Sequence, residues 1–436
     1  MMMAVHSSME KPLLRPLHVF ESWRPVVSGY TSRSWELVAS QIQAGGFEPR
    51  VVVSSRQDTY GKNSLDTPEG LENQPRLVPP SSFERLARRV RRFQVDRPHL
   101  ERAIERAVAD MDADLIHVHW SAGIGRAAAN VARKLGLPLV AEVRFDLAGA
   151  MMSETIGFPC HPLERILRSL FDGHLRQADA VVAAGDSLAA YLKQERPDLA
   201  NRLYSVSNGV NLQRFQPGPP DPDLCAQLGL AGKIVIGSTS NMLHYEGLDL
   251  FLHAMAELRQ QEPAVHALFV GGGTQAEHLS KLADQLGVPA TFTGLVPAAM
   301  VPSYLRLIDL YVIPRRDVTI TRHAGPIKLV EAMACGRPVV GSAVGDIQYL
   351  LADGRGQLVE PGSVNSLAGS LLELVRDPAK RAEIGRQARQ YAEANLTWDK
   401  AAVRHRSIYN SILGGSLHKT RPTPIPAPAA QASILS

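Results

Sequence analysis

Cysteine is scarce in this sequence. Its 436 residues include three cysteines, far apart and without metal-ligand spacing: Cys160, Cys225 and Cys335. An odd, sparse count excludes a disulfide-built scaffold and is typical of a reducing compartment. Long apolar runs are also missing. No stretch reaches the roughly 18 apolar residues of a membrane span, and residues 1–11 lack the apolar core of a signal peptide. We therefore expect a cytoplasmic protein.

Excess charge of one sign is equally scarce. The formal net charge is +4, from 47 Lys and Arg against 43 Asp and Glu, which is too small to indicate a nucleic-acid partner. One segment departs from this balance, because residues 83–93 place arginines among apolar residues: Arg85, Arg88, Arg89, Arg91 and Arg92. A basic amphipathic segment lies on an anionic membrane surface or forms a solvated helix face. The sequence leaves both interpretations open.

What the chain does contain is ordinary globular composition, 45% hydrophobic and 21% charged, with length for two or three domains. Its opening predicts a strand over 17–20, a loop over 23–30, a helix over 32–44 and a strand over 49–54. This order is typical of a doubly wound parallel sheet. A second such sheet is predicted to begin with the strand 233–237. The predicted fold class is therefore α/β, with two doubly wound, Rossmann-like domains.

The most informative stretch is 309–347. An apolar run at 310–313 predicts a buried strand, Pro326 and Gly336 bracket a helix, and 338–341 forms the next strand. The intervening loop leaves the carboxyl end of the first strand, where ligands bind in open α/β sheets. A helix N-terminus aimed at the same place favours phosphate. The loop adds three basic side chains: Arg315, Arg316 and Arg322.

Residues 326–340, Pro-Ile-Lys-Leu-Val-Glu-Ala-Met-Ala-Cys-Gly-Arg-Pro-Val-Val, resemble the retaining glycosyltransferases of family 4, and the resemblance covers nearly the whole chain. It implies the GT-B fold, in which two Rossmann-like domains face each other across a cleft. It also implies a nucleoside diphosphate sugar as donor substrate, with neither cofactor nor metal. Glu331 then inherits the role of accepting hydrogen bonds from the ribose hydroxyls. Outside such a motif, Lys328 and Glu331 would be an ordinary i,i+3 pair on a solvated helix face.

Two departures from the family pattern affect the donor site. The family usually has a second Glu eight residues before the first, where this chain has His323. It also has an Arg and a Lys for the diphosphate after the first strand of the second domain. Here Ser238-Thr-Ser-Asn241 and then His244-Tyr-Glu-Gly247 follow that strand, with no basic residue before Arg259. Lys328, with Arg315 or Arg316, is the predicted replacement for the phosphate, and Arg322 is a further candidate for phosphate or acceptor.

A glycine loop, Gly271-Gly272-Gly273, follows the predicted strand 267–270 and satisfies G-x-G-x-x-A. A dinucleotide fold would also need an acidic residue at the end of the next strand, and the strand 290–294 has none. Nicotinamide binding, and with it an oxidoreductase, is therefore disfavoured. The resemblance implies instead that this loop, Ser238 and the turn at Gly294 lie against the nucleotide.

The first domain carries the predicted acceptor side. Gly29 permits close backbone approach to the donor phosphates or the acceptor, although 29–30 is equally read as a turn before a helix. The resemblance implies that His119, at the end of the strand 115–120, faces the sugar. His117 lies inside the apolar run and is interpreted as a packed core residue. The acidic run 110–114 has metal-like spacing but precedes a strand, the wrong end for a ligand. It is read as turn chemistry.

These observations predict an acceptor-side domain at 15–210, a nucleotide-sugar domain at 211–397, a helix at 398–414 that crosses back, and a disordered tail at 415–436. The predicted activity is retaining, metal-independent hexosyl transfer to a glycan, lipid-linked or small-molecule acceptor in cell-surface or exported polysaccharide biosynthesis. The alternative is a catalytically degenerate nucleotide-sugar-binding or scaffold protein of the same fold, which would bind nucleotide and release no free nucleoside diphosphate.

Overall fold

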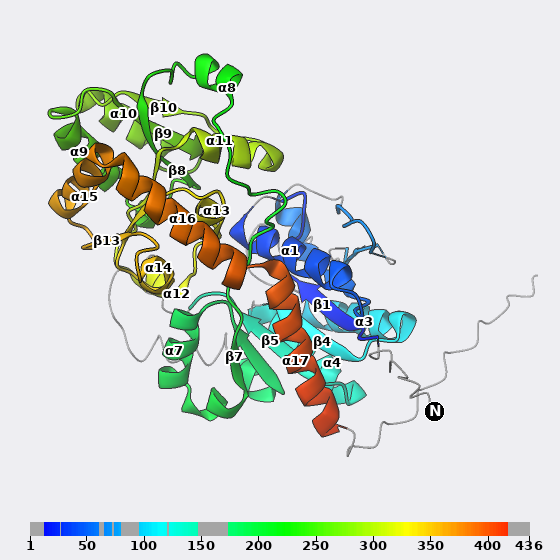
Figure 1. Cartoon of the computed structure of the whole chain (residues 1–436). Helices are drawn as coiled ribbons and strands as arrows, with labels where there is room; N and C mark the ends of the chain where they lie inside the picture. Colours follow the sequence, from blue (N-terminus) through cyan, green and yellow to red (C-terminus); the bar gives the residue numbers. More distant parts are fainter. Residues whose placement is uncertain are drawn as a thin grey trace, which may run out of the picture.

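The computed structural model describes residues 13–26, 28–60, 65–71, 74–79, 96–119, 122–146 and 173–416. The basic segment 83–93 and nearly all of the predicted tail lie outside these ranges, as does Cys160. Within them the chain forms two parallel sheets, each covered by helices (Figure 1). The predicted fold class is confirmed.

The first sheet has seven parallel strands in the order β3-β2-β1-β4-β5-β6-β7. Every residue of its central strands β1, β4 and β5 is buried, as expected where helices cover both faces. The strands are β1 (Pro16–Phe20), β2 (Arg50–Val53), β3 (Arg76–Leu77), β4 (Leu115–His119), β5 (Leu139–Val143), β6 (Ala180–Ala183) and β7 (Leu203–Ser205).

The helical elements of this domain are α1 (Gly29–Gln43), η1 (Ser55–Tyr60), α3 (Arg97–Met111), α4 (Ala122–Leu135), η3 (Gly173–Gln177), α7 (Asp186–Glu195) and η4 (Pro197–Arg202). Helix α1 begins three residues earlier than predicted. Ser28 accepts a hydrogen bond from the Thr31 N–H, and the Thr31 hydroxyl accepts one from the Ser28 N–H. This reciprocal capping box fixes the helix start at Gly29.

The second sheet has six parallel strands in the order β10-β9-β8-β11-β12-β13. Its strands are β8 (Ile234–Ser240), β9 (Val265–Gly271), β10 (Ala290–Phe292), β11 (Leu310–Ile313), β12 (Val339–Ser342) and β13 (Gln357–Val359). Alternate residues serve opposite faces: Tyr311 belongs to one core cluster with Leu329 of α13, and Val312 to another with Phe251 of α9.

Its helical elements are α8 (Pro222–Gln227), η5 (His244–Glu246), α9 (Leu248–Arg259), α10 (Ala276–Gln285), η6 (Ala298–Met300), α11 (Val301–Leu307), α12 (Thr319–His323), α13 (Ile327–Ala334), α14 (Asp346–Leu351), α15 (Val364–Arg376) and α16 (Pro378–Asn395). Helix α13 starts after Pro326 at its N-cap and ends before Gly336, whose φ is +65°. The predicted bracket therefore holds, with Pro326 one position earlier than expected.

The last helix, α17 (Trp398–Ser416), returns to the first domain and lies along α1 (Figure 1). Trp398, Ile408 and Tyr409 share a core cluster with strand residues such as Leu115 and Val140. The two chain crossings lie side by side, because Val210 and Thr397 form a parallel bridge. Within the described ranges every helix is too short or too polar to span a bilayer.

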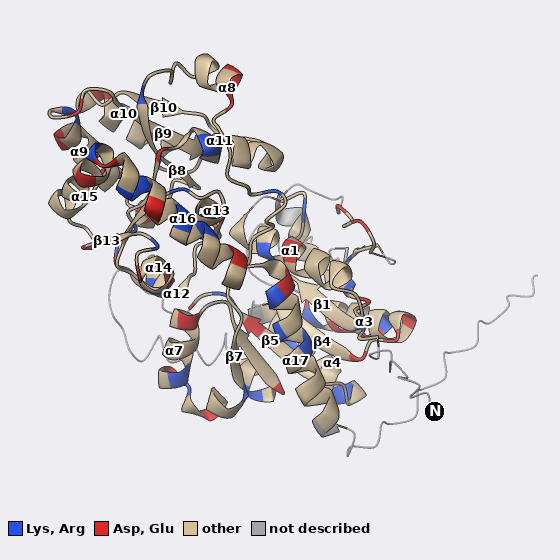
Figure 2. Ribbon diagram, in the orientation of Figure 1, with Lys and Arg blue, Asp and Glu red and all other residues tan. Residues whose placement is uncertain are grey.

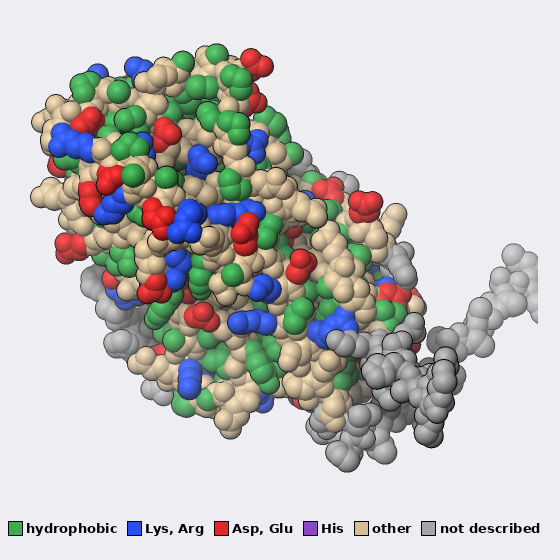
Figure 3. All heavy atoms as spheres, in the orientation of Figure 1, with side chains coloured by type: hydrophobic (Ala, Val, Ile, Leu, Met, Phe, Trp, Pro, Cys, Tyr) green, Lys and Arg blue, Asp and Glu red, His purple; other side chains and the backbone are tan. Residues whose placement is uncertain are grey.

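Charged residues of both signs are interspersed over both domains (Figure 2). The face shown in Figure 3 likewise carries Lys and Arg beside Asp and Glu. This mixture agrees with the small net charge of the chain.

Candidate active site

A cavity of about 460 Å³ lies between the two domains, at the carboxyl ends of both sheets. The first domain contributes the start of α1 and the residues after β5, and the second contributes η5, the end of β9, the loop after β11 and α13. Asn208 ties the walls together: its side chain accepts from Arg33 at 2.9 Å and donates to the Gly325 carbonyl at 2.9 Å. The cavity is therefore an interdomain cleft.

Five of the residues predicted from the sequence line this cavity: Gly29, Gly271, Arg315, Lys328 and Glu331. The structure thus brings together residues from three separate segments of the chain. The other predicted residues lie outside the lining: His119, Ser238, Gly272, Gly273, Gly294, Arg316, Arg322 and His323.

Glu331 faces the cavity from α13. Burial raises the pKa of its carboxyl to about 7, although the nearby Arg214 favours ionisation. Its predicted partner in the simple helix-surface interpretation was Lys328. The Lys328 ammonium instead donates to Glu246 at 3.3 Å, so that interpretation is wrong for Lys328.

Glu246 is the centre of a buried ionic cluster that the sequence did not predict. Arg315 donates from Nε and Nη2 to its two carboxylate oxygens, each at 3.2 Å, and Lys328 donates to one of them. Burial disfavours ionisation of Glu246, but the two cations outweigh it and hold the pKa at about 2. We call these three residues the Glu246 cluster. One signal of this cluster was present in the sequence. An acidic residue, Glu246, lies in the segment after β8, where the resemblance implies basic residues.

Backbone geometry places Glu246 against the loop that follows β11. Gly247 has a φ of +68°, and a Cβ there would lie 2.0 Å from the Pro314 carbonyl oxygen. On the other side of Glu246, the Tyr245 carbonyl accepts from the Arg316 N–H at 3.0 Å. Only glycine permits this approach, so the chain on both sides of Glu246 is fixed to the segment that carries Arg315.

The remaining charged candidates of this loop point elsewhere. Arg316 forms an ion pair with Asp249, and Arg322 pairs with Asp317 at 2.6 Å with both side chains about half exposed. His323 stacks on Tyr191 of α7, with ring centroids 3.9 Å apart. The short helix α12, which the sequence predicted as part of a loop, carries Arg322 and His323 to these positions.

The glycine loop is needed for packing. A Cβ on Gly273 would lie 1.6 Å from the Asn241 carbonyl oxygen, and one on Gly271 would lie 2.1 Å from that of Ser240. Both glycines therefore let the loop after β9 pack on the loop after β8. Gly272 lies beside Leu295. Gly294 pairs with Gly271 across an isolated bridge, and Ser238 is buried within β8.

His119 is fully buried and lies behind the cavity wall. Two lining residues cover it: the Tyr30 hydroxyl donates to its carbonyl at 2.9 Å, and Arg144 lies 3.0 Å from its Nδ1. The predicted contact of His119 with a sugar in this cavity is therefore not supported by its position. Sequence could place it at a strand end but not reveal the side chains that cover it.

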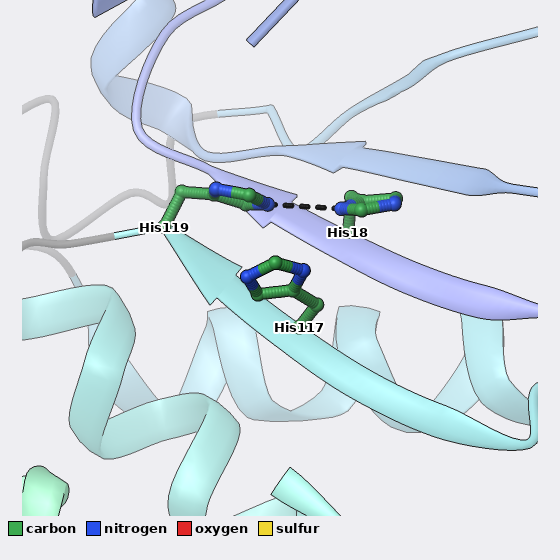
Figure 4. A group of neighbouring side chains, drawn as sticks. All are labelled: His18, His117 and His119. Carbon is green, nitrogen blue, oxygen red and sulfur yellow. Dashed lines mark hydrogen bonds between the residues drawn. The ribbon is translucent and has the colours of Figure 1, made fainter. Parts of the chain in front are cut away.

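His119 belongs to a chain of buried hydrogen bonds. Its Nε2 lies 2.9 Å from Nδ1 of His18 (Figure 4), whose Nε2 lies 2.9 Å from the Gln41 side-chain oxygen. Gln41 contacts the Tyr409 hydroxyl at 3.3 Å, which lies 2.6 Å from Nδ1 of His117. The chain therefore connects two strands of the sheet to α1 and α17.

A metal ion is one possible occupant of this cluster, because one ring nitrogen from each of His18, His117 and His119 lies within 4.8 Å of the others. Two buried guanidinium groups argue against it. Arg33 and Arg144 both donate to Glu142, which itself lies 3.1 Å from His119. Positive charges this close would repel a dication in a low-dielectric interior, so we interpret the cluster as a hydrogen-bonded network.

Comparison with known proteins agrees with this architecture. The family described as "Glycosyl transferases group 1" matches residues 224–391, and "Glycosyltransferase Family 4" matches residues 31–214. D-inositol 3-phosphate glycosyltransferase 1 of Catenulispora acidiphila is 30% identical over 356 residues, 74% of this chain and 79% of that protein.

A second relative is the GDP-mannose-dependent alpha-(1-6)-phosphatidylinositol monomannoside mannosyltransferase of Mycolicibacterium smegmatis. It is 32% identical over 215 residues, 46% of this chain, and the match spans 54% of its own length. The lipopolysaccharide core biosynthesis mannosyltransferase LpcC of Rhizobium leguminosarum bv. viciae is 30% identical over 248 residues, 55% of this chain and 66% of that protein.

Solved structures share the fold. Sucrose-phosphate synthase from Thermosynechococcus elongatus superposes with a TM-score of 0.71 at 19% identity, covering 92% of this chain and all of that one. Anabaena HepE in complex with UDP gives 0.65 at 20% identity, covering 91% of this chain and all of that one. Two matched sequence families, a relative matched over most of its length and this shared architecture lead to one conclusion. The chain belongs to the group 1 glycosyltransferases and has their GT-B fold.

Proposed function

We propose that this glycosyltransferase moves a hexosyl residue from a nucleoside diphosphate sugar to a carbohydrate acceptor, with retention and without a metal ion. The observation that carries the proposal is the convergence of Arg315, Lys328 and Glu331 in one interdomain cavity. Anabaena HepE has been solved with UDP and with UDP-glucose, and the mycobacterial relative is named as GDP-mannose-dependent. Those donors support the class of ligand and leave its base and sugar open.

In this proposal the diphosphate lies against Lys328 and Arg315. The ribose hydroxyls donate to Glu331, and the nucleotide runs past Gly271 and the neighbouring Leu295. Fixed cations beside the leaving group stabilise the negative charge that grows on it in the transition state, and such preorganised electrostatic stabilisation usually lowers the barrier more than any other single effect. Lys328 and Arg315 supply that charge in place of a metal. The cleft holds donor and acceptor in one orientation, which contributes further.

The acceptor is proposed to bind on the first-domain wall, beside Tyr30 and Arg144. Two relatives are named for phosphatidylinositol mannoside and lipopolysaccharide core synthesis. These names support a glycan or lipid-linked acceptor and cell-surface or exported polysaccharide as the product class. We further propose a cytoplasmic protein that docks on the inner membrane face to reach such an acceptor. The basic segment 83–93 is the proposed contact.

Vesicle sedimentation tests this membrane contact. Replacement of Arg88, Arg89, Arg91 and Arg92 by Gln should reduce sedimentation with anionic vesicles at low salt, because each charge near such a surface contributes about 1 kcal/mol. Equal sedimentation of variant and parent would contradict the contact without affecting the proposed chemistry.

A donor screen tests the activity itself. Uridine and guanosine diphosphate sugars are incubated with the protein and a lipid-linked glycan acceptor, and release of free nucleoside diphosphate is measured, with a Lys328→Met variant as control. Release by the parent and its loss in the variant is the expected result. His323, where the family usually has Glu, favours a second candidate, a non-catalytic nucleotide-sugar-binding protein. That candidate requires nucleotide binding without release.

A further inference from the structure

We infer that Glu246 is a positioning residue for the donor diphosphate, which aligns Arg315 and Lys328 on the phosphate oxygens during transfer. The inference rests on the proposed function and adds a role for a carboxylate where an anion is to be bound. A negative charge beside a phosphate site opposes phosphate binding. Its presence at the centre of the Glu246 cluster therefore needs an explanation other than attraction of the ligand.

The first observation is the geometry of Arg315. Its Nε and Nη2 donate to the two oxygens of Glu246, and its Nη1 donates to the Ala324 carbonyl at 2.9 Å. All three guanidinium nitrogens are therefore anchored, and the plane of the group is fixed. A fork held in one orientation loses little side-chain entropy when it meets an oxyanion.

The second observation is what Lys328 leaves free. An ammonium group has three N–H donors, and Glu246 is the one hydrogen-bond acceptor that the described residues offer it. Its side chain is 23% exposed, whereas that of Glu246 is 6% exposed. Lys328 is therefore held by the carboxylate through one donor, and two donors remain unpaired on a side chain that lines the cavity.

The third observation is that the backbone carrying the carboxylate is held in place. The backbone contacts of Gly247 and Tyr245 fix its position relative to the segment after β11. Glu246 thus acts as a rigid reference point for two long side chains that would otherwise sample many rotamers.

This arrangement predicts different effects on binding and on catalysis. Attraction between the cations and a bound diphosphate depends weakly on direction, and removing the Glu246 charge strengthens it. Stabilisation of the leaving group requires donors at particular oxygens in the transition state, and this alignment is lost without the anchor. A residue with a general structural role would instead weaken both.

The test compares Glu246→Gln with the parent on whichever donor the screen identifies. We expect kcat to fall by about tenfold or more, while the Kd for the free nucleoside diphosphate, measured by calorimetry, tightens or stays within about threefold of the parent. Glu246→Asp, which keeps the charge, should regain part of kcat. Thermal unfolding of each variant confirms that it is folded.

A matched control exists in the same two segments. Asp249 accepts from one guanidinium nitrogen of Arg316, and neither member of that pair lines the cavity. Asp249→Asn should therefore leave kcat and Kd unchanged.

Parental kcat in folded Glu246→Gln would overturn the inference and leave the glycosyltransferase proposal intact. A Kd weakened as much as kcat would also overturn it, because that pattern indicates a general structural role. Failure of the parent itself to release nucleoside diphosphate from any donor would instead contradict the proposed function, and the two failures are thereby distinguished.

Discussion

Each domain contains a buried carboxylate that holds two basic side chains. In the first domain Glu142 accepts from Arg33 and Arg144, and in the second Glu246 accepts from Arg315 and Lys328. In both, burial disfavours ionisation and the adjacent cations outweigh it, so that the pKa of the carboxyl is lowered. The two clusters have similar components, and they differ in how many N–H donors of the cations remain unpaired.

Each guanidinium group beside Glu142 has four of its five N–H donors paired. Arg33 also donates to Asn208 and to the Val206 carbonyl, and Arg144 also donates to Ser34 and the Tyr30 carbonyl. In the Glu246 cluster, Lys328 lines the cavity and has one of its three N–H donors paired. Arg33 and Arg144 line the cavity as well, so a buried ion pair at the cavity wall does not distinguish the two clusters. They differ in the larger share of unpaired N–H donors on Lys328.

The largest effect on stability should come from removing the charge of Glu142. Glu142→Gln leaves two buried guanidinium groups without a counter-charge, and we expect a loss of about 3–5 kcal/mol in the free energy of unfolding. Urea unfolding followed by fluorescence measures it, analysed for separate transitions of the two domains. Glu383→Gln, at an ion pair with Arg386 in which both side chains are about half exposed, is the control and should be indistinguishable from the parent. An equally small change for Glu142→Gln would erase the distinction between the two clusters.

The next effect concerns the Glu246 cluster. Lys328→Met should lower kcat by about 10²-fold or more, because it removes a preorganised donor from the leaving group, while the protein stays folded. Lys328→Arg should not restore the rate, since a guanidinium fork does not replace a point charge. Steady-state kinetics with the identified donor measures both variants. Near-parental turnover in Lys328→Met would remove the phosphate role from this side chain.

A third effect follows from Glu331. With the pKa of its carboxyl near 7, nucleoside diphosphate affinity should rise by up to about tenfold between pH 6 and pH 8, as the carboxylate that accepts from the ribose forms. Glu331→Gln should bind more weakly and lose this dependence, and it also controls for titration of the terminal phosphate. Calorimetry at several pH values measures it. A parallel pH profile in the variant would tell against Glu331.

The same raised pKa has the opposite effect on stability. Between the unfolded and folded pKa values, the folded protein binds more protons than the unfolded chain. The unfolding free energy contributed by Glu331 is therefore fully present below the unfolded pKa and is lost as the pH rises through about 7. Urea unfolding of the parent and of Glu331→Gln at pH 5 and pH 8 measures this effect. The loss of unfolding free energy between the two pH values should be larger in the parent.

The smallest effect is expected at Arg322. Because its ion pair with Asp317 is half exposed and outside the cavity, Arg322→Gln should change the unfolding free energy by less than about 1 kcal/mol and leave turnover unaltered. A tenfold loss of turnover would mean that α12 brings this side chain to the donor after all.

Local signals explain what the sequence could predict. Pro326, Gly336 and the apolar runs around them specify α13 and its flanking strands within one short stretch. Glu331 could be predicted as a site residue because the same stretch carries the family resemblance. Such features depend on neighbours in the chain, and they can be read without tertiary structure.

The rest depends on distant segments. Glu246 is hydrogen-bonded to Arg315 and Lys328, which lie 69 and 82 residues further along the sequence. No local sequence pattern predicts that pairing. His119 was placed correctly at the end of β4, but the side chains that cover it come from α1 and from the end of β5.

The most direct test of the account is the contribution of the second phosphate to nucleotide affinity. Calorimetry with uridine and guanosine mono- and diphosphates gives the ratio of the two Kd values for the parent and for Lys328→Met. The account predicts that the parent binds one diphosphate about tenfold or more tighter than its monophosphate, and that the ratio falls close to one in Lys328→Met. An unchanged ratio in the folded variant would contradict the claim that the Glu246 cluster is the diphosphate site.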